Sequence, residues 1–107
     1  MNGIPQLTAA ELKRRIDAGE DLLILDVREP HEYKIANIGG TLIPLGEIPA
    51  RMAEIDPERE IVVHCKMGGR SQRAAEFLSR SGYSKVSNLA GGIHAWAREV
   101  DAGLPLY

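Results

Sequence analysis

The chain has 107 residues and a mass of 11.7 kDa, which allows one domain of ordinary size, and we expect that domain to span residues 1–107. Hydrophobic residues make up 44% and charged residues 26% of the chain, a balance that excludes a disordered or collagen-like protein. The formal net charge of −2 gives no overall attraction for nucleic acid or an anionic membrane, and no apolar run approaches the ~20 residues that span a bilayer, so neither partner is expected.

Helices and strands alternate along the chain. In chain order we expect a helix that Thr8 caps and Gly19 ends, a strand at 22–25, a helical turn at 30–33, a short apolar segment at 41–43, a helix at 45–55, a strand at 61–63, a loop at 65–70, a helix at 71–81, a strand at 86–89 and a helix at 93–100. Thr8 and Glu11 have the spacing of a capping box, and the unbroken apolar run at 22–25 is typical of a strand covered on both faces. The pattern predicts an α/β fold with a mainly parallel sheet and helices on both faces.

Cys65 is the single cysteine of the sequence, so no intrachain disulfide can form. No Cys/His cluster has zinc spacing, and we expect no structural metal and no cofactor. A lone reactive thiol fits a reducing compartment, and the polar first residues are no signal peptide, so we expect a cytoplasmic protein. A free cysteine at a strand end is by itself most often a small buried hydrophobe.

The loop that follows Cys65 favours a functional thiol over that structural alternative. Ligands bind parallel sheets at the C-terminal ends of the strands, where Cys65 stands. The loop leads into a predicted helix N-terminus, whose free N–H groups and dipole favour an anion, and Gly68 and Gly69 allow successive N–H groups to turn inward. Between residues 61 and 75 the sequence has three cations and no acid: Lys66, Arg70 and Arg73. We expect this environment to stabilise a thiolate and to lower the pKa of Cys65.

The size of the loop bears on the reaction. Four residues separate Cys65 from Arg70, and so short a ring of N–H donors suits a terminal sulfur on Cys65 better than a tetrahedral phosphate. The loop also contains no general acid, which disfavours phosphatase chemistry. In sulfur transfer, a thiolate attacks the sulfane sulfur of a donor, the leaving group departs, and a persulfide waits for an acceptor.

Specific motifs extend over essentially the whole chain. They lie at 25–29 with Glu32 and Tyr33, at 43–45, at 63–65 with Gly68, Arg70 and Ser71, and at 88–93 with Trp96. With these motifs the chain resembles a single rhodanese domain, a sulfurtransferase. The resemblance implies that Cys65 carries the persulfide and that residues 65–70 form the active-site loop, one residue shorter than in the phosphatase relatives of the same fold.

Three further segments, 35–40, 96–101 and 104–107, are similar to the rhodanese domain at the C-terminus of adenylyltransferases that sulfurate ubiquitin-like sulfur carriers. This likeness implies possible protein partners: a ubiquitin-like sulfur-carrier protein, a cysteine desulfurase or an adenylyltransferase. The sulfur donor is expected to be a small anion such as thiosulfate, or a persulfide. The sequence leaves open which donor, acceptor and pathway the protein serves.

The expected site has Cys65 as nucleophile and an anion-binding loop made of Lys66, Met67, Gly68, Gly69, Arg70 and Ser71. Asp26 and Arg28, at the end of a central strand, are expected to support this loop through a salt bridge or hydrogen bonds, with direct contact to the substrate as the alternative. Arg70 either binds the donor or holds the loop, and Lys66 is expected to be exposed and to attract an anionic donor. Met67, an apolar side chain at the mouth of the site, suggests contact with a protein or organic acceptor.

Other candidate residues have simpler explanations. His64 precedes the nucleophile, but neighbouring side chains of a strand point to opposite faces, which favours packing over a Cys/His dyad. His31 and His94 are expected at the surface. No basic stripe accompanies the aromatic residues Phe77, Tyr83 and Trp96, so we expect them to pack rather than to stack on bases.

Two classes of function remain open. The first is a single-domain sulfurtransferase that acts through a Cys65 persulfide. The second is a docking or sulfur-relay module for a sulfur-carrier protein or an adenylyltransferase, with little activity on small donors. An intact Cys65 loop favours the enzyme, because a pure docking domain needs no thiol there.

Overall fold

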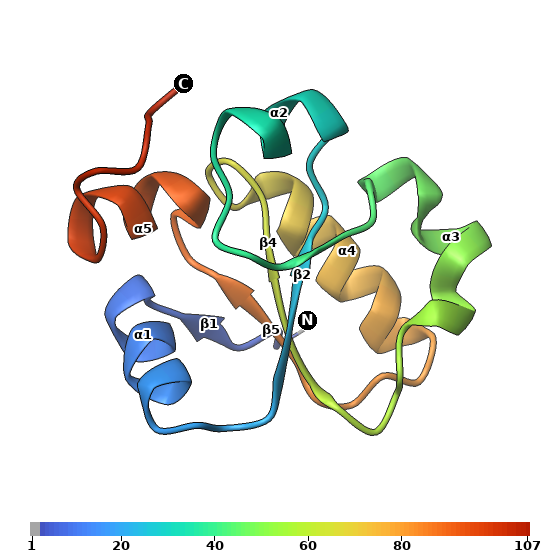
Figure 1. The fold of residues 1–107 in the computed structure, drawn as a ribbon. Helices are drawn as coiled ribbons and strands as arrows, with labels where there is room; N and C mark the ends of the chain where they lie inside the picture. The colour runs from blue at the N-terminus through green and yellow to red at the C-terminus, as the bar shows by residue number, and fades with distance from the viewer. Residues whose placement is uncertain (1–2) are drawn as a thin grey trace.

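A five-stranded, all-parallel sheet organises residues 3–107, the part of the chain that the computed structural model describes (Figure 1). Its strands, in spatial order, are β1 (Gln6–Leu7), β5 (Val86–Leu89), β4 (Glu60–His64), β2 (Leu22–Asp26) and β3 (Thr41–Leu42). The register places Asp26 of β2 opposite His64 of β4, so these two central strands end at the same level. The predicted α/β fold with a parallel sheet is confirmed.

Helices cover both faces of the sheet. Figure 1 shows α1 (Ala9–Asp17) and α5 (Gly92–Glu99) on one side, α3 (Ile48–Arg51) and α4 (Gly69–Arg80) on the other, and α2 (Pro30–Ile35) above the ends of β2 and β4. The capping box at the start of α1 is confirmed: Thr8 Oγ1 accepts from the Glu11 N–H at 3.1 Å, and Glu11 Oε1 accepts from the Thr8 N–H at 2.8 Å.

The predicted helix over 45–55 is wrong as a continuous element. The chain instead forms a 3-10 turn η1 (Leu45–Glu47), the single turn α3 and a second 3-10 turn η2 (Met52–Glu54). Pro49 lies in the first turn of α3 and has no N–H to donate to the carbonyl group four residues earlier, so an α-helix that began at Leu45 cannot run through it. β1 was not predicted, because two residues are too few to show a strand pattern.

The apolar core lies on both faces of β4. Ile61 and Val63 belong to a cluster with Leu78 of α4, whereas Val62 packs in a second cluster with Leu12 of α1 and Trp96 of α5. The alternation follows from the period of two along a strand. The expected packing role of the aromatic residues is confirmed, since Tyr83 and Trp96 are buried in these clusters and Phe77 packs against the first one.

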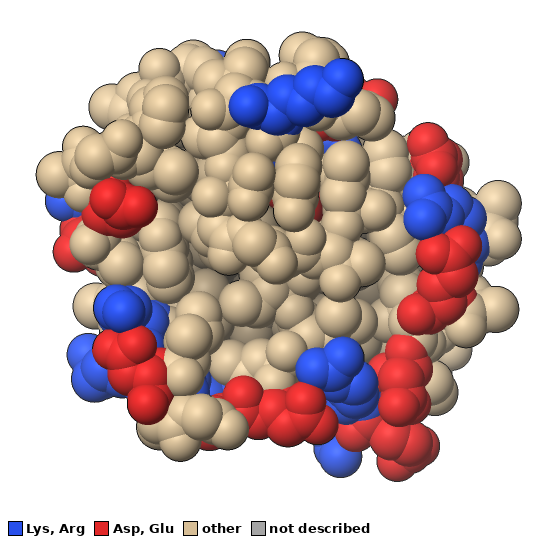
Figure 2. Space-filling model, viewed as in Figure 1, with Lys and Arg blue, Asp and Glu red and all other residues tan. Residues whose placement is uncertain are grey.

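Charged side chains in the view of Figure 2 lie mainly around the rim, with both signs interspersed and an uncharged centre. This face therefore offers no basic patch to a polyanion. Across residues 3–107, no helix has the length and apolarity needed to cross a membrane. Within the same residues, no three His, Cys, Asp or Glu side chains gather in a way that could hold a metal ion.

Candidate active site

Cys65 directly follows β4, at the C-terminal edge of the sheet, and the loop 65–68 connects it to α4. The helix begins at Gly69, two residues earlier than predicted, after Gly68 with a φ of 114°. The first turn of α5 fixes the same loop from the other side, because the N–H groups of Ile93 and His94 donate to the carbonyl oxygens of Cys65 and Lys66, at 2.9 and 3.2 Å. The loop is thus held between the starts of two helices.

The thiol of Cys65 is buried and surrounded by donors. Sγ accepts from the N–H of Gly68 at 3.1 Å, from the N–H of Ser71 at 3.4 Å and from the Ser71 hydroxyl at 3.3 Å. Burial is the largest single influence and raises the pKa of Cys65, but the hydrogen bonds from Ser71, Gly68 and Met67 together outweigh it and hold the pKa below its ordinary value. The arrangement therefore stabilises a thiolate at the head of α4.

Arg70 is paired with an acid that sequence reasoning did not assign to the site. Its Nη1 and Nη2 donate to the two carboxylate oxygens of Glu32 on α2, at 2.7 and 2.9 Å. The hydrogen bond from Arg70 is the largest cause that lowers the pKa of Glu32, to about 2, against the opposing effect of burial. The signal was present in the sequence, since Glu32 belongs to one of the motifs noted above, but a partner 38 residues away cannot be inferred from charge patterning.

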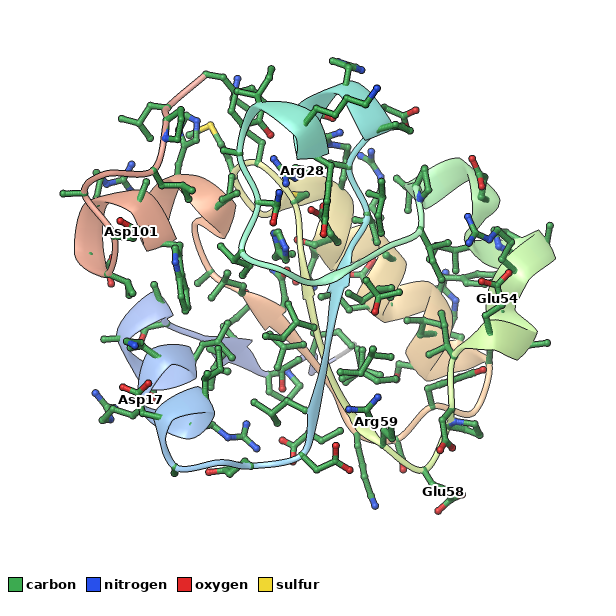
Figure 3. All side chains as sticks on the ribbon, viewed as in Figure 1. Asp17, Arg28, Glu54, Glu58, Arg59 and Asp101 are labelled. Atoms are coloured by element: carbon green, nitrogen blue, oxygen red, sulfur yellow. The ribbon has the colours of Figure 1, made fainter. Side chains whose placement is uncertain are left out.

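Asp26 and Arg28 form a fully buried salt bridge at the end of β2, and Figure 3 shows Arg28 beneath α2. Arg28 Nη2 donates to Asp26 Oδ2 at 2.7 Å and to the carbonyl oxygen of Ala36 at 2.8 Å, and Arg28 Nε donates to Asp26 Oδ1 at 2.9 Å. These bonds tie the chain around α2 to the end of β2. Among residues 3–107, no hydrogen bond joins this pair directly to the thiol.

Tyr107 enters the site from the segment after α5, and sequence reasoning missed it. Its hydroxyl accepts from Arg28 Nη1 at 2.7 Å and donates to Glu32 Oε2 at 3.0 Å. The Lys66 ammonium lies over its ring, 4.8 Å from the centroid, and the ring of His94 meets it edge-on at 5.9 Å. Tyr107 thus connects Arg28 and Glu32 to the active-site loop.

The contacts with Tyr107 correct the predicted exposure of two residues. Lys66 and His94 were expected at the surface, but both are half-buried. Lys66 packs its ammonium on the Tyr107 ring, an attraction between a cation and the negative face of an aromatic ring. His94 Nε2 lies 3.1 Å from the Tyr107 carbonyl oxygen. His31, by contrast, is exposed as predicted.

His64 is fully buried and forms no dyad with the thiol, as the strand geometry predicted. Its Nδ1 lies 3.4 Å from the Cys65 carbonyl oxygen and its Nε2 lies 3.7 Å from Asp26 Oδ2. Burial is the main cause that lowers its pKa, which favours a neutral ring.

A shallow groove of about 580 Å³ runs beside the loop and is lined by uncharged residues only. Met67, Gly68 and Gly91 form part of its rim, and the amide side chains of Gln72 and Asn88 line it as well. Met67 is 63% exposed, so the loop 65–68 itself presents an apolar side chain to solvent, as predicted. This combination suits an uncharged, partly apolar surface of another molecule better than a small anion.

Comparisons with known proteins agree with this geometry. A sequence model described as the rhodanese-like domain matches residues 8–99. A protein named "Sulfurtransferase" from Allochromatium vinosum is 39% identical over 104 residues, which cover 96% of this chain and 94% of that protein. The "Adenylyltransferase and sulfurtransferase MOCS3-1" of Zea mays is 36% identical over all of this chain, which spans only 25% of the longer relative.

The fold has close counterparts among solved structures. A rhodanese-related protein from Thermoplasma volcanium superimposes with a TM-score of 0.83 at 32% sequence identity, and the match covers 96% of this chain and 99% of the other. The likeness therefore extends over the sheet, the helices and the loop that holds Cys65.

Proposed function

Because the chain belongs to the rhodanese-like domain family, as a sulfurtransferase with one buried cysteine, we propose that it transfers sulfane sulfur through a persulfide on Cys65. The observation that carries this proposal is the set of hydrogen bonds donated to Sγ by Gly68 and Ser71. These donors stabilise an anionic Sγ, which is the state required for attack on a donor and the state to which Cys65 returns when the acceptor takes the outer sulfur.

The reaction has two balanced steps. In the first, the Cys65 thiolate attacks the sulfane sulfur of the donor, a new S–S bond forms, and the old one breaks with its electron pair leaving on sulfite or on a thiolate. In the second, a nucleophilic acceptor takes the terminal sulfur, and the electron pair of the broken S–S bond returns to Cys65 as a thiolate. The backbone N–H groups of Gly68 and Ser71 already point at Sγ before either step, so they need no reorganisation during it.

The charges around the loop support a persulfide donor over thiosulfate. Arg70 is engaged by both oxygens of Glu32, and Lys66 packs on the ring of Tyr107, so neither cation stands free at the mouth of the site. A thiosulfate dianion therefore meets less unpaired positive charge than the sequence suggested. A sulfane sulfur at the end of an extended, weakly charged group fits a buried thiol beside an uncharged groove.

The acceptor is proposed to be a protein. The exposed Met67 and the neutral groove beside it support a macromolecular surface at this position. The Zea mays relative is named an adenylyltransferase as well as a sulfurtransferase, which supports an adenylyltransferase or its sulfur-carrier protein as partner. A cysteine desulfurase would serve as the persulfide donor in such a relay.

The test measures sulfur on the intact chain. The reduced protein is incubated with thiosulfate or with cysteine persulfide, its mass is recorded, and cyanide is then added while thiocyanate is followed. We expect the wild type to gain one sulfur atom and to lose it to cyanide, more readily from cysteine persulfide than from thiosulfate, and Cys65→Ser to gain none.

The second class of function predicts different results. If the domain only docks, no sulfur gain is seen with either donor, and binding to a sulfur-carrier protein or adenylyltransferase survives in Cys65→Ser. Sulfur gain by Cys65→Ser, or none by the wild type with any persulfide donor, would contradict the proposed mechanism.

A further inference from the structure

A chain of side-chain amides leads from the surface of α4 to the residue that holds the thiol. Gln72 Nε2 donates to Glu76 Oε2 at 3.0 Å, Gln6 Nε2 donates to Gln72 Oε1 at 2.7 Å, and Asn88 Nδ2 donates to Gln6 Oε1 at 3.0 Å. Asn88 Oδ1 then lies 2.6 Å from Ser71 Oγ. Asn88 is 3% exposed and Ser71 is fully buried, so the last link is shielded from water.

The direction of every bond in this chain follows from its first member. The Glu76 carboxylate accepts and does not donate, so Gln72 must turn its NH₂ group toward it and its oxygen toward Gln6. The same reasoning turns the oxygen of Gln6 toward the NH₂ group of Asn88. The oxygen of Asn88 is left facing the Ser71 hydroxyl, and an amide oxygen can only accept.

The Ser71 hydroxyl has one proton and more than one acceptor within reach. Asn88 Oδ1 is the nearest at 2.6 Å, whereas the Gly68 carbonyl oxygen is at 3.2 Å and Cys65 Sγ at 3.3 Å. The Gly68 carbonyl oxygen already accepts from the N–H of Gln72 at 3.0 Å and from Asn88 Nδ2 at 3.4 Å, which occupies both of its lone pairs. The real competition for the Ser71 proton is therefore between Asn88 and the sulfur.

We propose that Asn88 is a positioning residue for the sulfur chemistry. By accepting the proton of the Ser71 hydroxyl, Asn88 favours the state in which Ser71 accepts from the Cys65 thiol over the state in which Ser71 donates to the Cys65 thiolate. The proposal rests on the proposed role of Cys65 as nucleophile. With a thiol, S–H donates to Ser71 Oγ and Ser71 O–H donates to Asn88 Oδ1. With a thiolate, the thiol proton has left to solvent, and Ser71 keeps its own proton but must turn it from Asn88 to Sγ.

Only the thiolate state bears a cost from the competition for the Ser71 proton. When Ser71 donates to the sulfur, its oxygen and Asn88 Oδ1 face each other at 2.6 Å with no proton between them. Asn88 therefore stabilises the thiol against the thiolate and limits what Ser71 contributes to the anion. It keeps the Cys65 thiolate a stronger nucleophile toward the sulfur donor than an unrestrained Ser71 hydroxyl would, since a thiolate of very low pKa is a weak nucleophile.

Other ionisable groups also surround the thiol, and none of them changes in the variants below. They are Lys66 in the loop, Arg70 on α4, Glu32 on α2, Asp26 at the end of β2, Arg28 just after it, His64 on β4, His94 on α5 and Tyr107. Because their charges are common to all variants, their effects cancel when the pKa of Cys65 is compared between proteins.

The experiment titrates Cys65, the single cysteine, by thiolate absorbance and by the pH dependence of its alkylation with iodoacetamide. Asn88→Ala and Asn88→Leu remove the acceptor, so we expect each to lower the pKa of Cys65 by about one unit, the size of one hydrogen bond to a charged group. Ser71→Ala should raise the pKa, and adding Asn88→Ala to Ser71→Ala should change it no further. Ser87→Ala, a neighbouring change on β5, should leave it unchanged.

The direction of the pKa change in the Asn88 variants separates this role from structural damage. Loss of the Asn88 acceptor should lower the pKa of Cys65, whereas a loosened loop would raise it toward that of an ordinary thiol. A raised or unchanged pKa in both Asn88 variants, or an equal drop in the Ser71→Ala background, overturns the inference. The titration needs no sulfur donor. A wild type that takes up no sulfur therefore refutes the proposed function alone, whereas a wrong pattern of pKa values in a protein that does take up sulfur refutes the inference alone.

Discussion

Glu32 neutralises Arg70 inside the site, and the cost of removing it depends on pH. Its pKa is about 2 in the folded protein, against an ordinary value of 4.5, chiefly because Arg70 donates to it. A lowered folded-state pKa means that the pair stabilises the fold above pH 4.5 and that this contribution is lost as the pH falls toward 2. The loss of folding stability at acid pH should therefore depend in part on Glu32.

The variant Glu32→Gln tests this. Between neutral pH and about pH 3, the wild type should lose about 1–2 kcal/mol more of its free energy of unfolding than Glu32→Gln, a figure reduced for the partial exposure of Arg70. Urea unfolding at both pH values measures it. The matched control is Glu58→Gln, an exposed carboxylate at the opposite end of the molecule (Figure 3), which should keep the wild-type pH dependence. Equal pH dependence in all three proteins would refute the argument.

The hydroxyl of Tyr107 lies between the buried guanidinium group of Arg28 and the carboxylate of Glu32. Tyr107→Phe keeps the ring over Lys66 but leaves both partners one hydrogen bond short, and we expect it to lower the free energy of unfolding by about 2 kcal/mol. Tyr33→Phe, which removes a single bond to the Gly40 carbonyl, should cost about 1 kcal/mol or less. Thermal and urea unfolding compare the two, and a larger loss in Tyr33→Phe would contradict the assignment.

The contact between α5 and the loop 65–68 depends on a glycine. Gly92 has a φ of +60°, and a Cβ built on it would lie 2.5 Å from the carbonyl oxygen of Lys66 and 2.6 Å from that of Cys65. Both obstacles are backbone atoms that also accept hydrogen bonds from α5. A side chain here must push the loop away from the helix.

Gly92→Ala should therefore lower the free energy of unfolding by about 2 kcal/mol or more and raise the pKa of Cys65 as the loop loses its position. Gly46→Ala is the control, since a Cβ at that position meets nothing within 4 Å. Urea unfolding and thiolate titration of both variants give the comparison. If Gly92→Ala behaves like Gly46→Ala, the close approach does not constrain the loop.

Elements with a strong local pattern could be predicted from the sequence, and elements fixed by distant contacts could not. The capping box of α1 and the apolar runs of β2 and β4 are local signals, and each appeared where expected. β1 exists only because Gln6 and Leu7 pair with Asn88 and Leu89, more than eighty positions away in the chain. The segment at 45–55 carried a helical apolar pattern, but Pro49 interrupts its hydrogen bonds.

The same division applies to the site. Cys65 and its glycine-containing loop could be recognised because they are contiguous, and their donors lie within six residues of the thiol. Glu32, Asn88 and Tyr107 could not be placed there, because the fold alone brings them to the loop from three other segments. The positive charge predicted for the loop was accordingly too high, since Glu32, which neutralises Arg70, is remote from it in sequence.

For the whole molecule, Arg28 is the point where distant parts of the chain meet. Its guanidinium group is fully buried and donates to Asp26 at the end of β2, to the carbonyl oxygen of Ala36 beyond α2, and to Tyr107 beyond α5. Through Tyr107 and Glu32 this cluster continues to Arg70 on α4. The loop 65–68 is thus supported by contacts that close only when the full sheet and its surrounding helices have assembled.

Replacing Arg28 should therefore destabilise the whole domain rather than one segment. Arg28→Met leaves Asp26 as a buried charge without its partner, and we expect a loss of about 3–5 kcal/mol in the free energy of unfolding. The double variant Arg28→Met with Asp26→Asn removes that uncompensated charge and should recover part of the loss. Urea unfolding followed by circular dichroism and by tryptophan fluorescence measures both, with coincident transitions expected because Trp96 packs in the core. A double variant no more stable than Arg28→Met would mean that the carbonyl and tyrosine contacts, and not the ion pair, give Arg28 its importance.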